Sequence, residues 1–266
     1  MLIIGESING TISSVGTAIV ERNENFLLEL AKEQIEKGAQ MLDINAGVAE
    51  GNEVEDLPWL VQLIQKKVSC PLMIDSNNPE ALKTGLEVYN HREPPIVNSI
   101  SGEKKKIDNI LPLISGKNYR IVTLCMDDHG IPTTPEKRVE VARQLYPILK
   151  DAGIPLQNIY FDPLVLSLGL NWEGAMVTLK TIELLKKELT ESHIICGLSN
   201  VGVELPLRKL VNRSFLPMAA YAGLDTFLID VRDKALTSTL IASTALIGKD
   251  PDCTEYLKAY RKKKLT

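Results

Sequence analysis

Short apolar runs alternate with longer amphipathic stretches along the whole chain. The spacing between successive runs is roughly what one strand, one helix and their loops require. Strands that are buried on both faces read as continuous apolar runs rather than as alternating ones. The pattern therefore predicts eight parallel strands, each followed by a helix, with the strands at residues 2–5, 41–44, 72–74, 96–97, 121–124, 159–161, 194–196 and 227–229.

The amphipathic stretches carry signals for helix ends. A helical period over residues 27–35 is followed by Gly38, a residue that commonly stops a helix. Asn77 stands two residues before Pro79 and reads as the cap of a helix that begins at that proline. A helix start is predicted in the same way at Pro135.

Eight strand–helix units in a chain of 266 residues fit a (β/α)8 TIM barrel. The alternative is a doubly wound open sheet, whose best marker is a Gly-x-Gly-x-x-Gly turn after the first strand. That turn is missing, because Gly5 is followed by Glu-Ser-Ile-Asn. We find no linker or composition shift and expect a single domain over residues 1–266. Pro147 and Pro217 fall inside helical patterns and predict kinks or breaks there.

Composition and charge narrow the class of protein. The net charge is −4, which does not favour nucleic acid, and the basic run at residues 261–264 reads as a solvated helix end or tail. The four cysteines are widely separated and show no metal-ligand spacing, so we expect no metal. No run approaches the ~18 apolar residues of a membrane span, and no leader segment is visible. These features favour a cytoplasmic protein.

Polar residues follow the apolar runs at the ends where a barrel carries its active site. Loops favour such residues as caps and turn formers, which explains some of them, for example Asp127 and Asp128 before Gly130. It does not explain why acids and amides gather with almost no basic residue. The set comprises Glu6, Asn9, Asp43, Asn45, Asp75, Asn77, Asn98, Ser99, Asp127, Asp162, Ser199, Asn200 and Asp230.

This set suits a ligand that donates hydrogen bonds. A phosphate site would offer lysine, arginine or a glycine-rich loop instead. Carboxylates accept from N–H groups, while amide side chains both donate and accept. The residues alone indicate a polar heterocycle with several N–H donors, a class that includes the pterins.

Six short segments at this end resemble the pterin-binding family. They are residues 5–9 (Gly-Glu-Ser-Ile-Asn), 42–45 (Leu-Asp-Ile-Asn), 74–77 (Ile-Asp-Ser-Asn), 98–101 (Asn-Ser-Ile-Ser), 162–164 (Asp-Pro-Leu) and 197–201 (Gly-Leu-Ser-Asn-Val). The chain looks most like the methyltransferases that move a methyl group between tetrahydrofolate and a corrinoid protein. The resemblance extends over essentially the whole chain.

The resemblance implies roles for individual residues. Asp75, Asn98 and Asp162 match residues that hold the hydrogen-bonding edge of the pterin, and Asn200 matches the asparagine at the nitrogen that carries the methyl group. The remaining predicted residues line or support the same site: Gly197, Ser199, Glu6, Asn9, Asp43, Asn45 and Arg208. Arg208 is equally well explained as a solvated residue in the first turn of a helix. Val203 replaces a polar residue of one relative, so that part of the network is open.

The chemistry requires help at the reacting nitrogen, because a tertiary amine is a poor leaving group. We expect a network in which Asn200 follows the protonation state of that nitrogen. His91, His129 and His193 fall at a helix end, in a turn and at a strand start, and only His129 is a candidate proton donor.

The resemblance also implies partners. The chain lacks a corrinoid-binding motif, because residues 127–132 place Pro132 where such a motif needs glycine. The cobamide is therefore expected on a separate corrinoid protein, with methyltetrahydrofolate or tetrahydrofolate as the small substrate, and a homodimer is expected from the relatives. The direction of transfer stays open. The alternatives are an enzyme like dihydropteroate synthase and a non-catalytic pterin-binding subunit.

Overall fold

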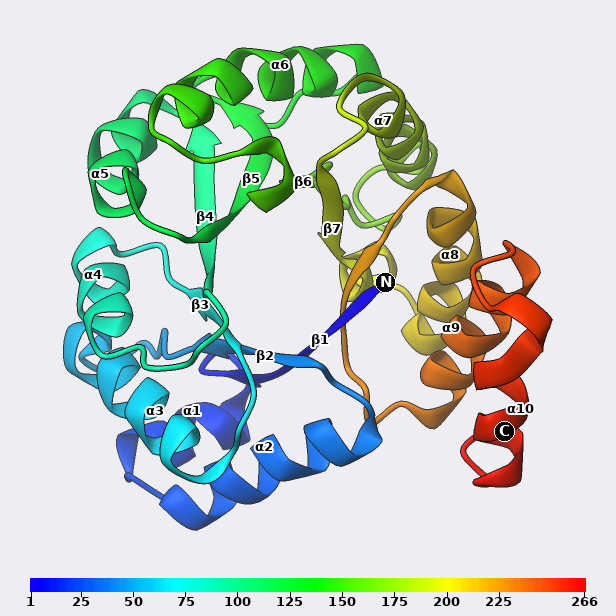
Figure 1. The fold of residues 1–266 in the computed structure, drawn as a ribbon, viewed down its shortest axis with the longest axis horizontal. Coiled ribbons are helices and arrows are strands. Elements are labelled where there is room, and N and C mark those ends of the chain that lie inside the picture. Colours follow the sequence, from blue (N-terminus) through cyan, green and yellow to red (C-terminus); the bar gives the residue numbers. More distant parts are fainter.

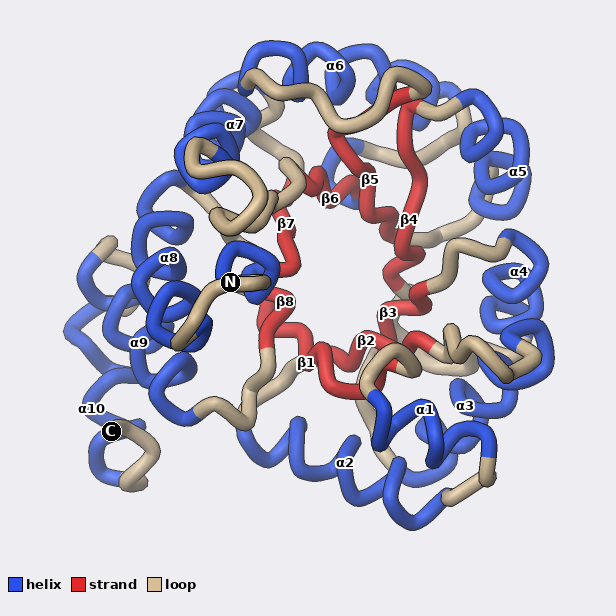
Figure 2. Tube along the Cα trace, turned by 180° about the vertical axis from the view of Figure 1, so that it is seen from behind, coloured by secondary structure: helices blue, strands red, loops and turns tan.

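Eight parallel strands close into a barrel in chain order, which confirms the predicted (β/α)8 architecture. The computed structural model describes all 266 residues. Figure 2 shows the strands as a ring enclosed by helices. The strands are β1 (Leu2–Asn9), β2 (Met41–Asn45), β3 (Leu72–Asp75), β4 (Ile96–Gly102), β5 (Arg120–Asp127), β6 (Ile159–Asp162), β7 (His193–Gly197) and β8 (Thr226–Ile229).

The helices follow the strands around the outside of the ring (Figure 1). A terminal helix, α10, packs against α9 outside the ring of strands. The helices are α1 (Ser13–Val20), α2 (Glu24–Lys37), α3 (Glu53–Lys67), α4 (Pro79–Glu87), α5 (Lys104–Ile114), α6 (Pro135–Asp151), α7 (Gly174–Glu188), α8 (Arg208–Ala222), α9 (Lys234–Leu246) and α10 (Thr254–Arg261), with 3-10 turns η1 (Leu156–Asn158), η2 (Leu198–Gly202) and η3 (Pro251–Cys253).

Two of the predicted helix ends are confirmed and one cap is corrected. Gly38 ends α2 with φ at 114°, a left-handed conformation that glycine adopts without strain. Helix α6 begins at Pro135, as predicted. The cap of α4 is Asn78 rather than Asn77, since the side chain of Asn78 accepts the backbone N–H of Glu80 at 3.0 Å.

The prolines inside helical patterns do not break them. Helix α6 continues through Pro147 and α8 continues through Pro217, so of the predicted kinks or breaks the breaks do not occur. A proline removes one backbone donor from the helix ladder, and the hydrogen bonds on either side keep the remaining turns helical.

Several strands run further than the apolar runs that predicted them. β1 continues past a register irregularity between Gly5 and Ile8 and ends at Asn9, while β4 continues to Gly102. Glu6 and Asn98 therefore lie on strands rather than in the loops after them. Side chains alternate along a strand, so polar residues two positions after a buried interior residue stay on the interior side.

The barrel has two apolar layers. The larger one fills the space between the strands and the surrounding helices. The smaller one closes the floor of the barrel with one buried side chain from each of seven strands: Ile4, Met41, Met73, Ile96, Val122, Tyr160 and Ile195. The floor is a packed core rather than a pore, so any site inside the barrel lies above it, at the carboxyl end of the strands.

Candidate active site at the mouth of the barrel

The strand register brings three of the predicted residues together. Asn45 pairs with Asp75 across β2 and β3, and Asp75 pairs with Asn98 across β3 and β4. The three side chains thus start from neighbouring positions on consecutive strands, two residues above the floor residues Met73 and Ile96. The result is a row of amide, carboxylate and amide at one side of the mouth.

Asp75 at the centre of this row is held by its neighbour. The side-chain amide of Asn45 donates to Oδ2 of Asp75 at 3.0 Å. Burial raises the pKa of Asp75 to about 6, with the Asn45 hydrogen bond acting against that rise and the charge of Glu53 adding to it. At pH above this value Asp75 is a carboxylate, the form that accepts N–H donors from a ligand.

Asp43 lies one step deeper on β2 and is almost fully enclosed. Asp43 is only 2% exposed, and its Oδ1 has no hydrogen-bond partner. Burial raises the pKa of Asp43 well above its ordinary value, and the nearby carboxylates of Asp75 and Glu6 raise it further. This environment favours the neutral carboxylic acid.

Asp162 ends β6 on the other side of the mouth. Its Oδ1 accepts the backbone N–H of Leu164 at 2.7 Å, and burial raises its pKa to about 7. The loop after it is fixed by Arg138, a fully buried residue of α6. Nη1 of Arg138 donates to the carbonyl oxygens of Pro163 and Leu164, each at 2.6 Å. Sequence reasoning missed Arg138, because a basic residue in an amphipathic helix is normally solvated.

The turn after β7 contributes a third group of residues. The hydroxyl of Ser199 donates to Oε1 of Glu6 at 2.8 Å, which joins the exits of β7 and β1. The exposed side chain of Asn200 lies against Gly197, where a Cβ atom would meet the amide nitrogen at 3.1 Å. Gly197 thereby leaves room for the side chain of Asn200.

Arg208 fits both of the descriptions that the sequence left open. It is an exposed residue that begins α8, and its Nη2 donates to the carbonyl oxygen of Ser199 at 3.1 Å. The backbone of Val203, rather than its side chain, takes part in the local hydrogen bonds. Its carbonyl oxygen accepts from the hydroxyl of Ser167, which ties the loop after β6 to the loop after β7.

The side chain of Asn9 stabilises the turn after β1. Its Oδ1 accepts both the backbone N–H of Thr11 at 2.9 Å and the hydroxyl of Thr11 at 2.7 Å. The backbone N–H of Gly10 donates to the carbonyl oxygen of Asn45 at 2.9 Å. These bonds fix the turn after β1 against the end of β2.

None of the three histidine rings is hydrogen-bonded to the acids and amides described above. His193 begins β7 at the amino end of the barrel and stacks on Tyr160 with ring centroids 4.7 Å apart. The Nδ1 atom of His91 accepts the backbone N–H of Glu93. His129 lies in the predicted turn, in which the backbone N–H of Gly130 donates to the carbonyl oxygen of Asp127 at 2.8 Å.

No group of three or more histidine, cysteine or acidic side chains is arranged to hold a metal ion. None of the helices has the length and apolar character to cross a membrane.

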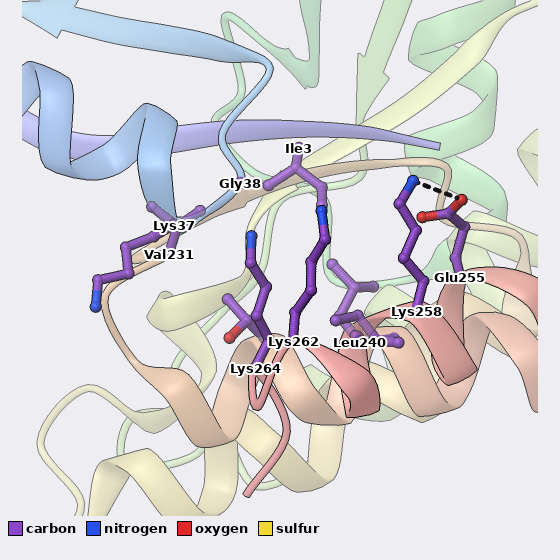
Figure 3. Close-up of a pocket in the computed structure, with 12 residues that line it drawn as sticks. Ile3, Lys37, Gly38, Val231, Leu240, Glu255, Lys258, Lys262 and Lys264 are labelled. Atoms are coloured by element: carbon purple, nitrogen blue, oxygen red, sulfur yellow. Dashed lines mark hydrogen bonds and ion pairs between the residues drawn. The ribbon is translucent and has the colours of Figure 1, made fainter.

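A lysine-rich groove lies on the outer wall of the barrel, between the end of α2 and helices α9 and α10 (Figure 3). Lys258, Lys262 and Lys264 line it together with Lys37, and Lys258 pairs with Glu255 at 3.3 Å. Residues 261–264 are all exposed and α10 ends at Arg261, which confirms the predicted solvated helix end, and two of these residues, Lys262 and Lys264, line the groove. None of the acids and amides of the mouth lines this groove.

The chain belongs to the family of pterin binding enzymes, whose model matches residues 5–230. The chain is 36% identical over 267 aligned residues to the methylcorrinoid:tetrahydrofolate methyltransferase of Eubacterium limosum, and the alignment covers 100% of this chain and 98% of that protein. It is 27% identical over 242 residues to the methionine synthase of Mycobacterium tuberculosis, covering 86% of this chain and 20% of that longer protein.

Solved structures of dihydropteroate synthase share the fold. The enzyme from Yersinia pestis superposes with a TM-score of 0.67 at 16% identity over 92% of each chain. The enzyme from Coxiella burnetii, solved with pteroic acid, superposes with a TM-score of 0.66 at 14% identity over 93% of each chain. At this level of identity the likeness establishes the barrel alone.

Proposed function

We propose that the chain is an enzyme that transfers a methyl group between a corrinoid carried by a separate protein and N5 of tetrahydrofolate. The row Asn45–Asp75–Asn98, facing Asp162 across the mouth of a closed barrel, is the observation that carries the proposal. The whole-length similarity to a methylcorrinoid:tetrahydrofolate methyltransferase supports it. It also favours the direction from methylcorrinoid to tetrahydrofolate.

The acids and amides would bind the pterin by its N–H donors. Asp75 and Asp162, as carboxylates, would accept hydrogen bonds from the amino and ring N–H groups, and Asn98 can both donate and accept. Gly197 and Ser199 would line the ring, while Glu6, Asn9, Asp43 and Asn45 support these side chains. Arg208, which is exposed beside Ser199, would lie near the outer part of the folate.

Asn200 would act at the reacting nitrogen. Its side chain is exposed at the mouth, and an amide can accept from a protonated nitrogen or donate to an unprotonated one. The displacement is in line, so the barrel mainly has to orient the nitrogen and exclude water from it. The same residues serve both directions of the transfer.

The barrel mouth would receive the corrinoid on a partner protein, with the folate bound beneath it. We further propose that the chain works in the cytoplasm and as a homodimer. None of the proposed steps requires nucleic acid, a membrane or a metal held by this chain.

One rival is a dihydropteroate synthase, which needs cationic groups for a diphosphate. Arg232, the basic residue nearest the end of β8, is already engaged, with its Nε 2.9 Å from Oδ1 and its Nη2 3.3 Å from Oδ2 of Asp230. This pairing disfavours that reaction. The other rival is a pterin-binding subunit without activity.

Purified protein tests the proposal. Incubation with methyltetrahydrofolate and reduced free cobalamin, the readily assayed reverse reaction, should produce methylcobalamin. Asp75→Ala and Asp162→Ala should each weaken folate binding by at least about tenfold, the usual cost of a hydrogen bond to a charged group. Asn77→Ala is the matched control, because Asn77 is exposed and contacts Lys106 instead.

Asn200→Ala separates a catalyst from a binding subunit. A catalyst should lose transfer rate far more than folate affinity, because the asparagine acts on the changing charge of the nitrogen. Folate binding without any methyl transfer by the unaltered protein would favour the subunit, and no folate binding at all would remove the proposal.

A further inference from the structure

Glu6 and Ser199 form a carboxylate–hydroxyl pair at the mouth whose members are 193 residues apart in the chain. We propose that Glu6 takes the proton released from N5 of tetrahydrofolate, through the hydroxyl of Ser199. This inference rests on the proposed methyl transfer and names the group that the reaction needs beyond Asn200.

The geometry prepares the pair for passing on a proton. Ser199 already donates its hydroxyl hydrogen to Oε1 of Glu6 at 2.8 Å, so the oxygen lone pairs of Ser199 are free to accept another hydrogen. Ser199 is half-buried and directly precedes the exposed Asn200 in the same 3-10 turn. The hydroxyl of the serine is therefore bonded to the carboxylate, and the next residue in the chain is the one proposed to act at N5.

The surroundings of Glu6 suit a proton acceptor at neutral pH. Burial raises the pKa of Glu6 to about 7, the Ser199 hydrogen bond acts against this rise, and the charge of Asp230 adds to it. A backbone hydrogen bond from Asp230 and the charge of Arg208 from α8 also lower the pKa of Glu6. A base is most effective when its pKa lies near the working pH.

The other charged and titratable groups around Glu6 come from β2, from β7 and from the segment after β8. The charge of Glu6 raises the pKa values of Asp43 on β2 and Cys196 on β7. Arg232, after β8, also feels the charge of Glu6 but is paired with Asp230. Glu6 therefore forms no ion pair, although the charge of Arg208 acts on it, and it can gain and lose a proton near neutrality.

The other acids at the mouth are less suited to this task. Asp230 is bonded to Arg232 and Ser7, and despite its burial these contacts lower its pKa. Asp75 and Asp162 are the residues proposed to bind the pterin edge. Asp43 lies deeper than the row Asn45–Asp75–Asn98 and favours its neutral form, so its carboxyl group is already protonated and cannot accept the proton.

The proton balance is complete. When N5 forms its bond to the methyl group it becomes a positively charged amine that still carries its hydrogen. The N5–H bond breaks and the hydrogen passes to Oγ of Ser199, while the former hydroxyl hydrogen of Ser199 passes to Oε1 of Glu6. Glu6 then releases one proton to water. In the reverse direction neutral Glu6 supplies the same proton to N5 before the methyl group leaves.

The test is the pH profile of methyl transfer from methylcobalamin to tetrahydrofolate, with folate affinity measured separately by calorimetry. In the unaltered enzyme the turnover rate should rise as the pH passes through about 7. Glu6→Gln should lower the rate at pH 8 by about 100-fold and abolish this rise, because glutamine accepts no proton. Folate affinity should change less than about threefold.

Ser199→Ala is the second variant and should behave like Glu6→Gln, and the double variant should be no slower than either single one. Glu6→Asp should recover part of the rate and a pH-dependent step. Glu103→Gln is the matched control. Glu103 accepts a hydroxyl hydrogen from Ser101 at 2.7 Å, the same kind of pair at the exit of β4, and the variant should leave the profile unchanged.

Each contrary outcome is distinct. A Glu6→Gln enzyme that keeps the rise through pH 7 at near-normal rate overturns the role of Glu6 while the methyl transfer stands. A loss that appears equally in folate affinity assigns Glu6 to binding and overturns it as well. An unaltered protein that transfers no methyl group overturns both this inference and the proposed function.

Discussion

The side chain of Asn45 bridges two elements of the mouth with a fixed orientation. Its amide nitrogen donates to Oδ2 of Asp75 at 3.0 Å, and its amide oxygen accepts the backbone N–H of Gly47 at 2.9 Å. Because both ends are engaged, the amide cannot turn over without losing both hydrogen bonds. Asn45 therefore holds the carboxylate of Asp75 and the loop after β2 together.

Asn45→Ala should make folate binding more sensitive to acid. The Asn45 hydrogen bond lowers the pKa of Asp75, so its loss lets burial raise that pKa above the present value of about 6. Folate binding needs the carboxylate, and the pH at which affinity is half lost should therefore move upward. At pH 6 the affinity should fall by about tenfold. Calorimetric titrations between pH 5 and pH 9 measure this, with the exposed Asn52→Ala as control.

Asp162→Asn should stabilise the folded chain at pH 8. Burial raises the pKa of Asp162 to about 7 from an unfolded value near 4, so the folded state holds a proton that the unfolded state has lost between these values. Stability contributed by this group therefore falls as the pH rises from about 4 to about 7. Asparagine removes the charge and can still accept the N–H of Leu164.

The expected gain for Asp162→Asn is on the order of 1–2 kcal/mol in the free energy of unfolding at pH 8, declining toward zero at pH 4. Urea unfolding at several pH values measures it. A variant that is less stable than the original at every pH would show that the carboxylate is stabilised by the fold rather than strained by it.

Gly197→Ala should impair methyl transfer more than folding. A Cβ atom at this position would lie 3.1 Å from the amide nitrogen of Asn200, so the asparagine must shift. The backbone of Gly197 has φ at −70°, which alanine tolerates, and stability should change by less than about 1 kcal/mol. We expect a loss of at least about tenfold in transfer rate.

Gly38→Ala is the control for Gly197→Ala, because the expected effects on stability and on transfer rate are reversed. No atom lies within 4 Å of its Cβ position, but its φ of 114° strains any other residue. This variant should lose about 1 kcal/mol of stability and keep its transfer rate. The reverse pattern in either variant would contradict the role given to Gly197.

Arg138→Lys should not substitute for the arginine. The guanidinium serves three backbone carbonyl oxygens, those of Pro132, Pro163 and Leu164, in a planar arrangement that an ammonium group cannot reproduce. We expect a loss of about 3–5 kcal/mol in stability, since a buried charge is left with fewer partners. Folate affinity should also weaken, because the loop positions Asp162. Chemical unfolding and calorimetry together test this, and a Lys variant of normal stability would refute it.

The sequence was sufficient for the barrel and for the set of polar residues at its mouth. Continuous apolar runs reported the buried strands, and the residues that follow them lie at one end of the barrel because all eight strands are parallel. The strand ends were less accurate. Glu6 and Asn98 belong to strands but lie beyond the apolar runs, because the strands continue into polar residues. A prediction that follows only the apolar residues therefore ends each strand too early.

Pairings over long distances in the chain could not be predicted. The bond between Ser199 and Glu6 depends on the closure of the barrel between its last strands and its first, which local pattern does not contain. Arg138 was missed for a related reason, since its partners belong to another loop. Asn77 and Asn78 are chemically equivalent as caps, and only the backbone shows that Asn78 is the one used.

The packed floor has a consequence for proton traffic. Ile4, Met41, Met73, Ile96 and their neighbours shut the lower end of the barrel, so the acids above exchange hydrogen ions with bulk water only from the open side. A ligand that covers that side therefore stops the acids beneath it from exchanging hydrogen ions with water. Heat measured for complex formation should accordingly vary with the ionisation enthalpy of the buffer, and this variation counts the hydrogen ions sealed in or expelled.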